Sequence, residues 1–262
     1  MKFNIIKYYN DYLHDKNKEA SIVREEKKGD RHSASSAGLC AKKEWYDRHH
    51  PELKQPYEDK TLRIFQVGNL IGEDIEKSLY HLVSIPSTTI STEDYIFDKE
   101  LNVGGSFDLL IVDELGVGYL YDYKTANMFS YNKMFGNKRP IDDTSGDHYR
   151  FQLGTYAYIL EKNYKKVYGF TKIGYMALIG YDKNFSSMVE QEVSNNYIDF
   201  AERYWKEAGP IIENPIEPEQ SQTVPYNTKD SWDCKYCNYN KSCNNPMNPI
   251  NKGIKNEKKI AI

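Results

Sequence analysis

The sequence lacks any long hydrophobic run. No stretch of about 18 consecutive apolar residues occurs, so no transmembrane helix is predicted. The first residues also lack the apolar core of a signal peptide. We therefore expect a cytoplasmic protein with no membrane partner. Hydrophobic residues make up 39% of the 262 residues, charged residues make up 28%, and mean hydropathy is −0.75. These values are typical of a soluble chain that is long enough to bury a core.

An excess of positive charge is also missing. The formal net charge is −3 at pH 7, so no overall field attracts nucleic acid, and any DNA binding must use local basic patches. One candidate patch contains Lys42, Lys43, Arg48, His49 and His50. An ordinary solvated helix face explains these residues equally well.

Cysteine is scarce, but its placement is informative. Three of the four cysteines form a C-x2-C-x5-C cluster, and the fourth lies far upstream: Cys40, Cys234, Cys237 and Cys243. In a cytoplasmic protein, clustered cysteines indicate metal ligands rather than disulfides. Four thiolates suit Zn²⁺ or an iron–sulfur cluster. The alternative is a set of unrelated free thiols.

The stretch 103–125 reads as a β-hairpin. Residues 103–112 and 117–125 are rich in β-branched and aromatic side chains, and Asp-Glu-Leu-Gly at 113–116 is a turn signal. If the hairpin is centred on Leu115, residues whose numbers sum to 230 lie opposite each other. The hairpin therefore fixes which side chains meet across the two strands.

This register brings three charged side chains together. Asp108 lies opposite Asp122, with Cβ atoms roughly 4.5–5.5 Å apart, and Lys124 points to the same face as Asp122. Two carboxylates this close repel unless a cation lies between them. Oxygen ligands suit Mg²⁺ or Mn²⁺, so the hairpin predicts a metal site. The alternative is an exposed strand face with solvated charges.

An amphipathic helix is predicted upstream, over 62–82. Its apolar residues recur at steps of three and four: Ile64, Val67, Ile71, Ile75, Leu79 and Leu82. Gly68 and Gly72 have no side chain and would allow another segment to approach the helix backbone closely. Glu73 or Glu76 would add a carboxylate to the metal site.

The long segment 126–147 is a predicted loop. It carries Lys133, Lys138 and Arg139 and is either a DNA-contacting loop or a mobile insertion. The remaining expected elements are a helix over 3–13, a charged loop over 24–30, a short helix over 40–46 capped from 33–36, a strand and turn over 87–99, a helix over 148–163, a strand over 172–181, a helix over 193–206, a linker over 214–231 and a disordered tail over 244–262.

The chain contains a series of short motifs. In order they are an upstream cysteine, a glycine-containing helix, G-x-x-D at 105–108, D-x-K at 122–124, Q-x-x-x-Y at 152–156 and three late cysteines. This series resembles the RecB-type branch of the PD-(D/E)XK nuclease superfamily. The chain is most similar to the CRISPR-associated exonucleases and the AddB-type nuclease domains, over about 33–243. The resemblance implies an α/β fold with a restriction-endonuclease-like core, in which helices flank a mixed central sheet.

The same resemblance implies site roles. Asp108 and Asp122 would bind Mg²⁺ or Mn²⁺ with the Tyr123 carbonyl, and Lys124 would assist the attacking water. Gln152 and Tyr156 would support the site and contact DNA. The four cysteines would hold a 4Fe-4S cluster, with structural Zn²⁺ as the alternative. The cluster would join the N-terminal helix to the C-terminal segment.

One position departs from the family pattern. Where the family has histidine four residues after the helix glycine, this chain has Gly72. Glu76 or Glu73 would have to replace it. We expect an N-terminal helical extension over 1–32, a nuclease domain over 33–243 and a flexible tail over 244–262.

The expected function is a metal-dependent DNA exonuclease acting on single strands or ends. Its context would be recombination, repair, phage or CRISPR adaptation, with a protein partner from one of these processes. Two alternatives remain open. One is a catalytically weakened DNA-end-binding or protein-interaction module on the same fold, and the other is a restriction-type endonuclease.

Overall fold

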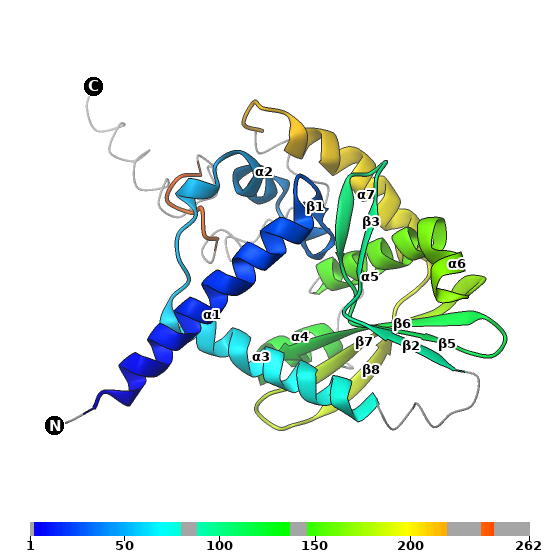
Figure 1. Cartoon of the computed structure of the whole chain (residues 1–262), viewed down its shortest axis with the longest axis horizontal. Coiled ribbons are helices and arrows are strands. Elements are labelled where there is room, and N and C mark those ends of the chain that lie inside the picture. The colour runs from blue at the N-terminus through cyan, green and yellow to red at the C-terminus, as the bar shows by residue number, and fades with distance from the viewer. Residues whose placement is uncertain (1–2, 80–87, 137–145, 219–236, 244–262) are drawn as a thin grey trace. The chain divides into compact units, whose positions relative to one another are not determined.

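The computed structural model describes residues 3–79, 88–136, 146–218 and 237–243. It divides into two compact units (Figure 1). The first contains residues 1–37 and 58–203, and the second contains residues 38–57 and 204–262. The predicted limits of the nuclease domain, after residue 32 and at residue 243, stay a prediction. The predicted tail over 244–262 lies outside the described residues. No helix in the described part of the chain is long and apolar enough to cross a membrane.

A five-stranded mixed sheet forms the centre of the first unit, in the order β2-β5-β6-β7-β8 (Figure 1). β6 pairs with β7 in parallel, and the other neighbours are antiparallel. The strands are β2 (Thr89–Thr92), β5 (Leu109–Val112), β6 (Val117–Ala126), β7 (Lys172–Asp182) and β8 (Met188–Glu192). The predicted mixed central sheet is confirmed, although β8 was not predicted.

The predicted hairpin register is confirmed between β5 and β6. Leu109 pairs with Tyr121 and Val112 with Gly118, and in each pair the numbers sum to 230. The prediction of one continuous strand over 103–112 is wrong. That stretch breaks at Phe107 and Asp108 into β4 (Val103–Ser106) and β5. β4 belongs to a separate sheet of order β1-β4-β3, with β1 at His32–Ser33 and β3 at Tyr95–Asp98.

One face of the central sheet packs into the hydrophobic core. Leu110, Leu120, Met176 and Leu178 are all fully buried. The strand register places them on one face, because Leu110 and Met176 both flank Leu120. α5 (Asp147–Ile159) packs on β6 and β7 and buries most of its own residues. Asp122 continues this apolar row of β6 and is itself buried.

In the first unit, two α-helices precede the central sheet. α3 (Asp59–Ser78) is the predicted amphipathic helix. Its N-terminal half differs from expectation, because Ile64 and Val67 are exposed and Leu62 is buried. α1 runs over Ile5–Lys28, so the predicted charged loop at 24–30 is helical as far as Lys28.

Polar contacts hold α1 against α3. Asn10 and His14 of α1 bind Asp59, Arg63 donates to Asn10, and Lys16 donates to Gln66. This polar seam lies between the N-terminal halves of the two helices.

The segment predicted as a long loop is partly helical. α4 covers Met128–Phe135, and Asn127 caps it by accepting a hydrogen bond from the Ser130 backbone N–H. The other predicted helices are present as α5, continued by a π-helical turn at Leu160–Tyr164 and α6 (Lys165–Tyr168), and as α7 (Asn196–Glu213). Most of the predicted linker lies outside the described residues.

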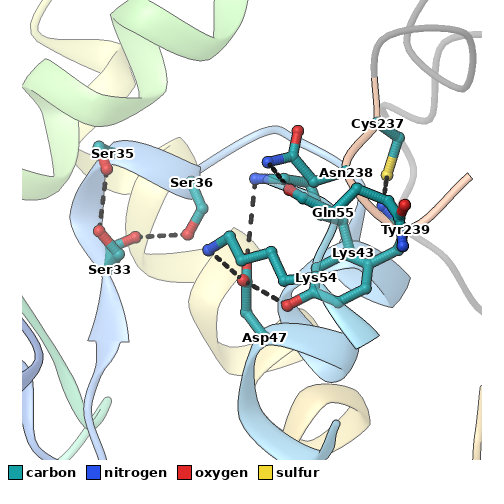
Figure 2. A network of polar contacts seen from close by, with 10 residues as sticks. All are labelled: Ser33, Ser35, Ser36, Lys43, Asp47, Lys54, Gln55, Cys237, Asn238 and Tyr239. Carbon is teal, nitrogen blue, oxygen red and sulfur yellow. Dashed lines mark hydrogen bonds and ion pairs between the residues drawn. The ribbon is translucent and has the colours of Figure 1, made fainter. Parts of the chain in front are cut away.

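The second unit packs α2 (Ala41–His49) against residues 237–243. Trp45 and Tyr46 form a buried aromatic cluster with Tyr239. Tyr239 Oη donates to Asp47 at 2.7 Å, and Lys54 donates to the same carboxylate at 2.6 Å. Figure 2 shows these bonds together with the reciprocal pair between Gln55 and Asn238. These contacts join the two segments.

Candidate active site

The candidate site lies where β5 separates from β6. The β5–β6 ladder ends at the Leu109–Tyr121 pair, so within the described structure Asp122–Ala126 of β6 pair only with β7. The backbone N–H of Tyr123 has no β5 partner and donates instead to Asp108 Oδ2 at 2.6 Å. The break in the predicted strand thus places the Asp108 carboxylate beside Asp122.

Asp122 is the most unusual residue of the site. It is 0% exposed, on a sheet face where Leu120 and Leu178 are its neighbours. Its Oδ2 forms an ion pair with Lys124 Nζ at 2.5 Å, neither carboxylate oxygen accepts a hydrogen bond within the described structure, and Oδ1 has no ion-pair partner there. A buried carboxylate oxygen without a partner is costly. This oxygen therefore has the position expected of a cation ligand.

The charges of the site are strongly coupled. Burial raises the pKa of Asp122 to about 7, although Lys124 opposes the rise. Burial also raises the pKa of Asp108, against the opposing effects of Lys124 and the Tyr123 N–H. Burial by itself would lower the pKa of Lys124, but the two carboxylates outweigh it and raise the pKa. Without a bound cation, Lys124 is the counter-ion of both aspartates.

Glu76 and Glu73 differ in placement. Glu76 Oε1 accepts a hydrogen bond from Thr92 Oγ1 at 2.6 Å, and its charge contributes to the raised pKa of Asp108. Glu73 is exposed. Of the two alternatives, Glu76 is the one beside the aspartates. Gly68 brings α3 close to β6, because a Cβ there would lie 3.0 Å from Thr125 Oγ1, whereas Gly72 has open space.

The predicted pair on α5 lies behind the aspartates. Gln152 Nε2 donates to Tyr156 Oη at 3.1 Å, and both residues are buried. Burial and then the charges of Asp122 and Asp108 raise the pKa of Tyr156 well above its usual value. Gly105 makes room for this ring, since a Cβ there would lie 3.1 Å from Tyr156 Cε1.

Glu93 is a neighbour that the sequence analysis missed. Its backbone N–H donates to the Asp108 carbonyl at 3.4 Å, and it adopts a left-handed conformation with φ 53°. The residue as a whole is exposed, but partial burial of its carboxylate, followed by the charges of Asp108 and Glu76, raises its pKa to about 7. No spacing signal in the sequence indicates it, because the contact depends on the turn between β2 and β3.

The described residues contain no group of three His, Cys, Asp or Glu side chains arranged to hold a metal ion. Mg²⁺ does not require such a group, because it commonly binds through one or two carboxylates and completes its shell with water and substrate phosphate. Asp108 and the unpartnered oxygen of Asp122 fit that donor set. The Tyr123 N–H donates to Asp108, and the role of the Tyr123 carbonyl as a metal ligand stays a prediction.

The predicted DNA-contacting residues are only partly described. Lys133 is exposed in the last turn of α4. Lys138 and Arg139 lie outside the described residues.

Three of the four cysteines are described, and all three belong to the second unit, but within the described residues they do not form a group arranged to hold a metal ion. Cys40 is the N-cap residue of α2, and Cys237 and Cys243 pack against the Trp45–Tyr46–Tyr239 cluster. Burial and then, among other effects, the nearby charges of Cys237 and Cys243 raise the pKa of Cys40 to about 11. The Tyr239 N–H donates to Cys237 Sγ at 3.4 Å (Figure 2). Cys234 lies outside the described residues.

Comparisons with known proteins bear on the fold. The crystal structure of a protein named SSO0001 is similar over 90% of this chain and 96% of its own, with a TM-score of 0.55 and 14% identity. An alkaline exonuclease from Laribacter hongkongensis gives a TM-score of 0.35 and 12% identity over 70% of this chain and 88% of its own. A protein provisionally named an exonuclease, from Eubacterium rectale, gives a TM-score of 0.34 and 17% identity over 53% of this chain and 49% of its own.

No curated protein sequence matches the chain. The family profile described as the PD-(D/E)XK nuclease superfamily matches residues 14–244. This match includes both aspartates, Lys124, the α5 pair and all four cysteines. The chain belongs to the PD-(D/E)XK nuclease superfamily.

Proposed function

We propose that the protein is a metal-dependent DNA exonuclease that hydrolyses phosphodiester bonds of single strands or DNA ends. The observation that carries the proposal is the buried Asp122, whose Oδ1 has no partner in the described structure while Asp108 and Lys124 lie beside it. Membership of a nuclease superfamily supports the same chemistry. The preference for ends rests on the resemblance to exonuclease families.

Asp108 and Asp122 would hold Mg²⁺ or Mn²⁺, with Glu76 as the nearest further carboxylate, Glu73 as a more distant one and the Tyr123 carbonyl as an additional ligand. The bound metal would polarise the phosphate and lower the pKa of a coordinated water. Lys124 would hold the attacking water or stabilise charge on the phosphate.

Gln152 and Tyr156 would keep the aspartates in place from α5. Lys133 of α4 would contact the DNA backbone, together with Lys138 and Arg139. These three residues are close together in the sequence and would supply the local basic patch that a chain of net negative charge needs for DNA binding.

We also propose a 4Fe-4S cluster on Cys40, Cys234, Cys237 and Cys243. The proximity of Cys40 to Cys237 and Cys243, and the N–H bond to Cys237 Sγ, support a shared centre. Structural Zn²⁺ is the alternative. Anaerobic purification distinguishes the two, since thiolate-bound clusters absorb near about 400 nm and Zn²⁺ sites are colourless.

A non-catalytic DNA-end-binding or protein-interaction module is the second candidate function. Gly72 favours it, because no side chain there can replace the histidine of related enzymes. The natural context would be recombination, repair, phage or CRISPR adaptation in the cytoplasm, with a protein partner from that process.

The deciding experiment is digestion of end-labelled and end-blocked single strands by anaerobically purified protein, with Mg²⁺ or Mn²⁺. An exonuclease degrades strands with a free end and spares strands with both ends blocked. Cleavage of closed circles would indicate an endonuclease. Binding without cleavage under both metals would contradict the proposal and favour the binding module.

A further inference from the structure

Lys124 has a second neighbour besides the aspartates. Its Nζ lies 4.9 Å from the ring centroid of Tyr149, over the ring face. The Lys124 side chain is only 16% exposed. An ammonium over an aromatic face is attracted by the negative charge of that face, and the attraction is stronger where water is excluded.

The ring contact and the ion pair both act on the ammonium as a whole. Asp122 Oδ2 lies 2.5 Å from Lys124 Nζ but accepts no hydrogen bond within the described structure, and the aromatic face consumes no particular donor. Within the described structure the N–H groups of Lys124 are thus held in place but stay usable. A group that assists a water or a phosphate needs this combination of fixed position and unused donors.

The surroundings of Tyr149 hold the ring in place. Tyr149 lies in the first turn of α5, where its N–H donates to the Gly146 carbonyl at 3.0 Å. Gly146 caps the helix in the left-handed conformation and lies against Met134. The same helix carries Gln152 and Tyr156, so one rigid element sets all three side chains.

The ring of His148 lies 3.8 Å from that of Tyr149 and does not add a competing charge. Burial, then the charges of Lys124 and Arg150, lower the pKa of His148 to about 4. At neutral pH His148 is therefore uncharged beside Lys124.

We propose that Tyr149 is a positioning residue of the nuclease: its aromatic face holds the Lys124 ammonium in the orientation that assists hydrolysis. The proposal rests on the proposed function. It assigns the ring, rather than the hydroxyl, as the part of Tyr149 that matters.

The test is single-turnover and steady-state cleavage of end-labelled single strands by the full-length, anaerobically purified protein. Tyr149→Phe should stay within about twofold of wild type. Tyr149→Leu should lower kcat about 10- to 30-fold with KM nearly unchanged. Tyr158→Leu is the matched control, because Tyr158 lies on the same helix and carries a similar contact with Lys162, 5.1 Å from its ring centroid. It should leave kcat unchanged.

A second series removes any dependence on folding. Phenylalanine bearing one, two and three fluorines at position 149 keeps the ring shape but progressively weakens the negative face. We expect kcat to fall stepwise with fluorine number, while the thermal midpoint stays constant. A purely structural ring would give no such trend.

The experiment distinguishes failure of the Tyr149 proposal from failure of the nuclease proposal. An active wild type whose kcat is insensitive to fluorination, or whose Tyr149→Phe variant is as impaired as Tyr149→Leu, overturns the role of the ring and leaves the nuclease proposal standing. A wild type that cleaves nothing with either metal overturns both.

Discussion

The carboxylate site of the first unit and the cysteine region of the second unit hold their functional groups by different means. Asp122 and Lys124 lie two residues apart on one strand, and the β6–β7 ladder fixes them. Cys40 and Cys237 are far apart in sequence, and side-chain contacts such as Tyr239 with Asp47 bring their segments together. Backbone pairing positions the first site before any metal binds. The second depends on contacts that are individually weak, so a bound cluster or metal ion would contribute much more to its stability.

The largest expected effect concerns Asp122. Asp122→Asn should lower cleavage about 10³-fold or more, because a principal metal ligand is lost. Mg²⁺ or Mn²⁺ should raise the thermal midpoint of the wild type through binding to the folded state, and the variant should lose this rise. Differential scanning fluorimetry with and without metal measures it. An equal rise in both proteins would contradict the assignment of Asp122 as a metal ligand.

Loss of the cysteine centre should affect stability more than chemistry. Cys40→Ser should abolish absorbance near about 400 nm and lower the thermal midpoint by roughly 5 °C or more. The remaining folded protein should still cleave DNA. Ser242→Ala, next to Cys243, is the control and should keep its colour. If the variant keeps its absorbance, Cys40 is not a ligand.

The two glutamates of α3 should behave differently. Glu76→Gln should lower kcat about 10- to 100-fold, because Glu76 lies beside Asp108. Glu73→Gln, on the same helix but exposed, should stay within about twofold. The measurement is cleavage across a Mn²⁺ titration. The reverse ranking would assign Glu73 to the site.

Gly105 tests the link between the sheet and α5. In Gly105→Ala the new methyl group would press on Tyr156 and on Ala34, 3.2 Å away. We expect a destabilisation of about 1–3 kcal/mol from overpacking and a several-fold loss of activity. Gly72→Ala, where no atom lies within 4 Å, should stabilise the helix by up to about 1 kcal/mol. Urea unfolding compares the two variants.

The smallest effect concerns Asp47 of the second unit. Burial by itself would raise its pKa, but Lys43, Lys54 and Tyr239 outweigh burial and lower it. A carboxyl whose folded-state pKa is lowered stabilises the fold above its unfolded pKa of about 3.9 and loses this contribution as pH falls. Asp47→Asn should therefore cost about 1–2 kcal/mol near pH 7. The difference from wild type should shrink below about pH 4, as urea unfolding at several pH values would show.

Local patterns predicted much of the site's framework. The turn at 113–116 and the alternation of β6 predicted the hairpin register, because pairing across a tight turn depends on neighbouring residues. The helical spacing of 152 and 156 predicted that Gln152 and Tyr156 share a face, and they are hydrogen-bonded. Period and turn chemistry also predicted most helices and strands, and the family resemblance implied a mixed sheet flanked by helices.

Other features were decided by packing between distant segments. The exposed apolar residues of α3 contradict the local pattern, because the contact between α1 and α3 is polar and long-range. The helical course of residues 24–28 also differs from the predicted loop. Glu93 and Tyr149 have no motif of their own. Glu93 reaches the site only because two strands turn beside Asp108, and Tyr149 only because α5 packs across β6.

The sequence by itself determined the superfamily, through motifs spread along the chain. It also determined the hairpin register and the shared face of Asp122 and Lys124, because these depend on residues close together along the chain. Only the tertiary structure decided that the predicted strand breaks at Asp108, that Glu76 rather than Glu73 lies beside the aspartates, and that Asp122 Oδ1 is buried without a described partner. Each of these depends on which distant segments exclude water from the site, and burial is a property of the packed molecule rather than of any local pattern.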